Sequence, residues 1–191
     1  MKTMCSITVL CDNRVHDPGC VAEHGFSLWL ETSGGRVLFD TGSGKGIGRN
    51  SERMGIELSG ADALVLSHGH DDHVGGLSWA WSQAPRARLF MHPAAIAQRY
   101  SIRNGKSHSI GMNREARAIV ESRLESIVWT AKPTEIVPGV FATGAIPRHT
   151  GYEDTGGPFF LDAQGREPDS VICPCCGKGA LDMGFAGKHS P

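Results

Sequence analysis

The chain has 191 residues, an ordinary share of apolar residues and a formal net charge of −1, which fits a globular protein with one main core. Nothing in this composition suggests the basic surface that nucleic-acid-binding proteins use. The N-terminal apolar run is too short for a signal peptide, and no segment reaches the ~20 apolar residues of a membrane span. We therefore expect a cytoplasmic protein, without a membrane or nucleic-acid partner and without structural disulfides.

The first elements are predicted to be antiparallel strands. Alternation predicts a strand over 5–10, and a second strand over 24–31 turns at Gly34-Gly35 into a third over 36–40. The glycine-rich segment 42–48 lacks the Gly-Lys-Ser/Thr ending of a P-loop, so we expect a loop beside the site, with a phosphate or carboxylate contact as the alternative.

The remaining elements alternate between helices and strands, which predicts an α/β fold. The segment 101–112 is expected to be a loop over the pocket. Its Arg103, Lys106 and His108 would suit an anionic substrate, and a solvated loop is the alternative. Helices are predicted over 47–55, 77–83, 94–100 and 114–124, and strands over 61–66, 88–91, 126–130, 134–137 and 140–143.

A dense group of metal-ligand side chains follows the predicted strand 61–66. Three histidines and two aspartates lie within positions 68–73. Imidazole and carboxylate are ligands of Zn²⁺ and similar first-row ions, so iron or manganese stays open. A polar surface turn is the alternative, but it explains only one or two of these residues. We predict the metal ligands His68, His70, Asp72 and His73, with the first two on one ion and the last two on a neighbouring ion.

The stretch 67–76 resembles the signature of the metallo-β-lactamase-fold superfamily, including the preceding strand and the trailing Gly-Gly-Leu. Segment 34–42, which ends in Asp40-Thr41-Gly42, is similar to a second superfamily motif. The resemblance implies that Asp40 supports the metal histidines from behind and fixes their orientation. It also implies an αβ/βα sandwich with mixed sheets.

Within this superfamily, the chain is most similar to the subgroup related to the methanopterin-pathway dihydropterin ribofuranosyl-aminobenzene phosphate synthase. The similarity lies in Asp12-Asn13 and in the segments 24–27, 50–58 and 144–148. It implies that His24 lies near the metal pocket, where it either contacts substrate or caps a strand. It also implies that Arg148 and His149 belong to a substrate-binding segment.

After Arg148 the chain departs from the family pattern. A further metal histidine is expected in a Gly-Cys-Ser/Ala-His-like stretch, which is absent, and His189 is the candidate for an extra ligand. We predict a metallo-β-lactamase-like domain over 1–170 and a divergent Cys-rich tail over 171–191. The tail is either a genuine replacement or the result of a truncation or frameshift. We favour the second explanation, because the residues before the tail follow the family pattern and those within it do not. The second half of the fold would then be incomplete.

The leading hypothesis is a zinc-dependent hydrolase that acts on a small anionic substrate, with one or two ions. Zinc would lower the pKa of a water molecule toward ~7 and polarise the scissile group, and Asp72 or Asp71 would take up the proton. The subgroup resemblance implies instead a pterin-pathway synthase-like transferase. A truncated chain would be a non-catalytic metal-binding remnant, and the tail cysteines would allow a zinc-ribbon interaction module. A homo-oligomer is possible but not predicted.

Overall fold

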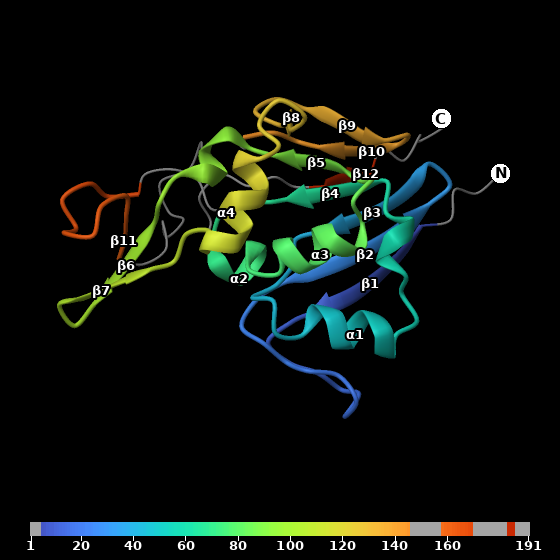
Figure 1. Ribbon diagram of the computed structural model, residues 1–191, viewed down its shortest axis with the longest axis horizontal. Helices are drawn as coiled ribbons and strands as arrows, with labels where there is room; N and C mark the ends of the chain where they lie inside the picture. Colours follow the sequence, from blue (N-terminus) through green and yellow to red (C-terminus); the bar gives the residue numbers. More distant parts are fainter. Residues whose placement is uncertain (1–4, 146–157, 170–182, 186–191) are drawn as a thin grey trace, which may run out of the picture.

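The main structural unit is a six-stranded mixed sheet (Figure 1). A computed structural model describes residues 5–145, 158–169 and 183–185. The first three strands are antiparallel, as predicted, and the strands that follow are parallel to the third. In spatial order the strands are β1 (Ser6–Cys11), β2 (Ser27–Thr32), β3 (Gly35–Phe39), β4 (Ala63–Leu66), β5 (Arg88–Met91) and β8 (Val128–Trp129).

Helices cover one face of this sheet and strands cover the other. Because side chains alternate along a strand, Leu64 and Leu66 pack under the helices while Ala63 and Val65 face the opposite side. The helical layer contains α1 (Ile47–Arg53), α3 (Leu77–Gln83) and α4 (Arg114–Glu121), with the short η1 (Leu58–Gly60) beside it. The opposite face packs on a small sheet of β9 (Thr134–Val137), β10 (Val140–Ala142) and β12 (Met183–Phe185).

The predicted α/β class and mixed sheets are confirmed, and the predicted elements differ mainly in their ends. The helices expected to reach residues 55 and 124 end at Arg53 and Glu121, and the strand expected over 126–130 is only two residues long. Among the described residues, no helix follows α4, so these residues contain one of the two helical layers expected for an αβ/βα sandwich. Within the same ranges, no helix has the length and apolar character to cross a membrane.

The prediction of a helix over 94–100 followed by a loop over 101–112 is wrong. The helix is a short 3-10 turn, η2 (Pro93–Ile96), after which the chain enters a hairpin of β6 (Tyr100–Arg103) and β7 (Lys106–Ser109). Asn104 and Gly105 both have positive φ angles, 51° and 71°, as a two-residue hairpin turn of the Asn-Gly type requires. This dipeptide was the sequence signal for the hairpin.

Arg99 explains why the helix stops early. Its guanidinium group is buried and donates hydrogen bonds to the carbonyl oxygens of Ala94 and Ala97, at 2.8 and 3.2 Å. The Ala94 carbonyl is one that a continued helix would need for its own hydrogen bond. Arg99 also forms a buried ion pair with Asp169 (3.0 Å), which fastens the segment 158–169 and its strand β11 (Phe159–Phe160) beside β6.

Replacement of Asp169 by Ala is expected to lower the free energy of unfolding by about 3 kcal/mol or more, because it leaves the Arg99 charge buried without its carboxylate. Urea unfolding at neutral pH measures this loss. The matched control is Arg166→Ala, which removes an exposed arginine of the same segment and should leave stability nearly unchanged. Equal stability of the two variants would contradict the role assigned to the buried pair.

Candidate metal centre

The predicted metal ligands lie where two neighbouring parallel strands end. Asp40 follows β3, and Ser67 and His68 follow β4, so their side chains meet at the same edge of the sheet. The carboxyl edge of parallel strands is where open α/β sheets bind ligands. The chain then turns into the short helix α2 (Asp71–Val74), which carries Asp72 and His73.

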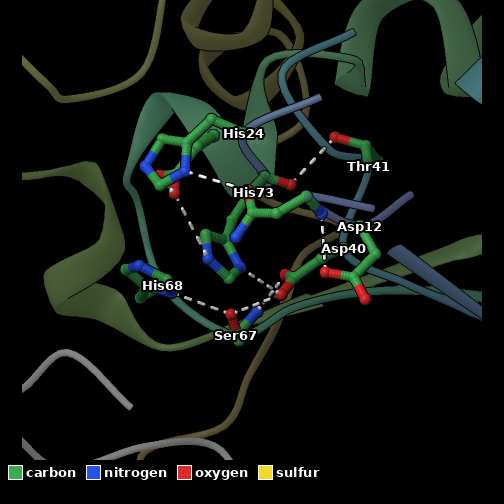
Figure 2. A network of polar contacts seen from close by, with 9 residues as sticks. Asp12, His24, Asp40, Thr41, Ser67, His68 and His73 are labelled. Atoms are coloured by element: carbon green, nitrogen blue, oxygen red, sulfur yellow. Dashed lines mark hydrogen bonds and ion pairs between the residues drawn. The ribbon is translucent and has the colours of Figure 1, made fainter. Parts of the chain in front are cut away.

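The Asp40 carboxylate holds this edge together (Figure 2). One of its oxygens accepts the Ser67 amide at 2.8 Å, and the other accepts the Ser67 hydroxyl at 2.6 Å and the Nδ1 of His73 at 2.7 Å. Asp40 is 1% exposed and has a φ of +53°, a left-handed conformation that aspartate tolerates better than most residues. Residues in such sparsely populated backbone conformations often occur at functional sites.

Two histidines have their Nδ1 atoms engaged from behind. The His68 Nδ1 lies 2.8 Å from the Ser67 hydroxyl, and the His73 Nδ1 lies on Asp40. The opposite nitrogen, Nε2, is therefore the atom through which each ring would bind a metal ion. Asp40 thus has the position that the family resemblance implies for it.

The described part of the chain contains two groups of possible ligand atoms. In each group, the atoms lie within 4.8 Å of one another: the first comes from Asp40, His68 and His73, and the second from His68, His70 and Asp72. The hydrogen bond between Asp40 and His73 already accounts for the first group. The second group joins two buried imidazoles to a carboxylate that also lies 3.7 Å from the His73 Nε2. We expected Asp72 to share an ion with His73 only. In the structure, Asp72 also lies close to His68 and His70.

This donor set fits a zinc ion. Two imidazoles and one carboxylate are a common catalytic zinc set, which leaves a position for water or substrate. The rings are close: the centroid of His68 lies 4.6 Å from that of His70 and 4.2 Å from that of His73. We call His68, His70, Asp72 and His73 the histidine cluster.

Gly69 allows the turn between the first two histidines to lie against η2. A Cβ atom at this position would collide with the carbonyl oxygen of Ala95. The close approach of two backbones therefore requires glycine here.

His92, which follows β5, caps η2: its ring accepts a hydrogen bond from the Ala94 amide at 3.1 Å. Burial and the nearby Arg99 charge lower the pKa of His92.

A cavity of about 860 Å³ opens in front of the histidine cluster. One side of it carries acidic and imidazole groups, and the other is formed by the β6–β7 hairpin and β11. Its lining residues are Asp12, Asn13, His24, Gly25, Phe26, His70, Asp71, Asp72, His73, Ser101, Arg103, His108, Ile110 and Phe159. We call it the main cavity.

His24 lies at the rim of the main cavity, 83% exposed at its side chain. Its Nε2 is 3.5 Å from an Asp72 oxygen, and its Nδ1 is 3.1 Å from the Asn13 side chain. The strand begins only at Ser27, so His24 does not cap it directly. Asp71 also lines the cavity, and burial, with the neighbouring Asp72 charge, raises the pKa of its carboxyl group.

Glu23 is a buried carboxylate that sequence reasoning missed. One oxygen accepts hydrogen bonds from the Ser43 hydroxyl (2.6 Å) and from the amides of Lys45 (2.8 Å) and Gly46 (3.0 Å). Burial acts to raise the pKa of Glu23, but these hydrogen bonds, with one from the Cys11 thiol, lower it overall. The amides of the glycine-rich loop thus bind a carboxylate of this chain, and Gly42, at φ +64°, is close against it.

Three predicted site residues, Arg148, His149 and His189, lie outside the described residues. The same holds for the tail cysteines Cys173, Cys175 and Cys176. Of the tail 171–191, the structure describes only β12, which pairs with β10. The proposed boundary at residue 171 and these residue roles therefore stay predictions.

The fold and the histidine cluster define an α/β protein with a candidate metal centre at the carboxyl edge of its parallel strands. The family model described as "Metallo-beta-lactamase superfamily" matches residues 21–163. The chain therefore belongs to the metallo-β-lactamase superfamily, as the two motifs around Asp40 and His68 predicted.

Two curated relatives come from Methanocaldococcus jannaschii. The protein described as "Uncharacterized protein MJ0448" is 29% identical over 148 residues, which cover 77% of this chain and 56% of that protein. The 7,8-dihydropterin-6-methyl-4-(beta-D-ribofuranosyl)-aminobenzene-5'-phosphate synthase is 26% identical over 131 residues, which cover 65% and 45%. The chain spans about half the length of these relatives, and the second belongs to the subgroup that the softer motifs suggested.

Solved structures that resemble the chain include further members of the superfamily. The Rm3 metallo-beta-lactamase has a TM-score of 0.43 and 19% identity, and the alignment covers 66% of this chain and 46% of that one. A metallo-beta-lactamase of Cronobacter sakazakii has a TM-score of 0.44 and 21% identity, with coverage of 73% and 51%.

Replacement of Glu23 by Gln is expected to lower the free energy of unfolding by about 2 kcal/mol near neutral pH, because three hydrogen bonds lose their charged acceptor. Since folding lowers the pKa of Glu23, its contribution is complete above the ordinary value of 4.5 and is lost as the pH falls through the lower folded value. The stability gap between wild type and variant should therefore shrink in acid.

Urea unfolding of both proteins near neutral pH and in acid, about pH 3, measures this gap. Glu52→Gln, an exposed substitution on α1, is the matched control and should show no such gap. A gap that stays constant or widens in acid would contradict the assignment.

Proposed function

We propose that the chain is a zinc-dependent enzyme of the metallo-β-lactamase fold that hydrolyses a small anionic substrate. The observation that carries this proposal is the convergence of ring nitrogens from His68 and His70 with an Asp72 oxygen at a cavity wall. Membership of the superfamily supports a metal at this place.

Each residue of the cluster has a role in this proposal. His68, His70 and Asp72 would hold zinc, and His73 would complete the cluster toward a second ion. Ser67 and Asp40 orient two of the rings by binding their Nδ1 atoms. Zinc bound there would supply a water of lowered pKa and would polarise the scissile group. Asp71 and Asp72 line the cavity and are the proposed acceptors of the proton that is released.

Replacement of His70 by Ala is expected to remove bound zinc and to abolish hydrolysis of a generic phosphoester or lactone, because one of the converging ligands is lost. Elemental analysis and an absorbance assay measure the two effects. His16→Ala, which removes an exposed histidine outside the cavity, is the control and should change neither. Unchanged turnover in the His70 variant would overturn the proposal.

Replacement of Asp40 by Asn is expected to weaken zinc binding by about 10- to 100-fold, because the His73 ring loses its charged acceptor. A competition titration with a chromogenic chelator measures the affinity, and circular dichroism checks that the fold is retained. An unchanged affinity in a folded variant would contradict the orienting role of Asp40.

A second candidate reaction is synthase-like transfer, which the named relative from Methanocaldococcus jannaschii favours. In that case the cluster would position substrate anions. Mass spectrometry of products from a dihydropterin and an aminobenzene ribofuranosyl phosphate would distinguish this activity from hydrolysis.

A non-catalytic role is the alternative from another class. Metal content separates it from the enzyme hypotheses: about two tightly held zinc ions per chain favour an enzyme, and none or one loosely held ion favours a binding role.

A further inference from the structure

The wall of the main cavity opposite the histidine cluster carries one aromatic ring and three side chains with O–H or N–H groups. Phe159, Ser101 and His108 are direct cross-strand partners on β11, β6 and β7, so their side chains share one face. Arg103 lies two residues after Ser101 and faces the same way. All four line the main cavity.

Ser101 is the residue of this wall that indicates a ligand. Its side chain is buried, at 6% exposure, yet its hydroxyl group has no hydrogen-bond partner among the residues that the structure describes. A buried hydroxyl without a partner is costly, and a bound oxyanion would satisfy it. The Arg103 guanidinium and the His108 ring add further N–H donors beside it.

The wall is held at a defined distance from the cluster. The Phe159 ring lies 5.6 Å, centroid to centroid, from the His70 ring, and Ser101 is the next residue across the sheet. The segment that follows β7 also contacts the cluster, because the Ile110 carbonyl oxygen accepts a hydrogen bond from the Asp71 amide at 2.9 Å. The buried pair of Arg99 and Asp169 fixes β6 and β11 to each other.

We propose that Ser101, Arg103 and His108 form a subsite for the phosphate group of the substrate, on the wall of the main cavity that faces the metal centre. The proposal rests on the proposed function, since it names the group by which the same cavity holds its substrate. An arginine fork binds carboxylate and phosphate alike, but guanidinium, hydroxyl and imidazole together offer donors for the three terminal oxygens of a phosphate ester, whereas a carboxylate has only two. Zinc at the cluster would offset the charges of Asp71 and Asp72, which otherwise repel an anion in this cavity.

The test is calorimetric titration of the zinc-loaded full chain with inorganic phosphate. Arg103→Gln is expected to weaken phosphate binding by about tenfold or more, and Ser101→Ala by a smaller factor, with zinc content unchanged. Arg114→Gln, which removes an exposed arginine of α4 outside the cavity, should bind phosphate like the wild type.

The outcomes separate this inference from the proposed function. A chain that holds no zinc contradicts the proposed function, and the phosphate titration of the zinc-free Arg103 and Arg114 variants then decides on the subsite alone. Equal phosphate affinity of these two variants overturns the subsite, because the anion then binds elsewhere or only to the metal. Acetate that binds as tightly as phosphate and with the same dependence on Arg103 overturns the assignment to phosphate.

Discussion

The buried carboxylate of Asp40 is the interaction on which the candidate site depends. It joins the end of β3 to the end of β4 through Ser67 and to α2 through His73, so three separate segments have fixed positions relative to one another. A buried charge is tolerated only when its hydrogen-bonding capacity is used, and here three donors use it. The same contacts that offset the cost of this buried charge also orient the His73 ring directly and the His68 ring through Ser67.

Two other buried charged groups bind the backbone of irregular segments. Glu23 binds the amides of the glycine-rich loop, and Arg99 takes the carbonyl oxygens at the end of η2. Both side chains form hydrogen bonds with backbone groups of irregular segments. Buried charged side chains therefore hold segments that lack the regular backbone pairing of a sheet.

The sequence predicted the parts of the site that lie close together along the chain. The cluster of residues 68–73 and the strand before it were visible as a pattern, and so was the motif that ends in Asp40. The hairpin wall was missed because Pro93 and the apolar residues after it favour a helix, and only the Asn104-Gly105 turn signalled strands. Glu23 and Ser101 could not be found from pattern, since their roles arise from contacts with segments distant in sequence.

The ion pair between Arg99 and Asp169 joins residues 70 positions apart. Contacts of such long range form late in folding, because closing a long loop costs conformational entropy before the contact is gained. The histidines, in contrast, lie within six consecutive positions, and the Asp40 carboxylate that orients two of them is 27 to 33 positions from its partners. We therefore expect the wall that carries the histidine cluster to form before the wall of β6, β7 and β11, so that a nascent chain presents the metal ligands before it encloses a substrate.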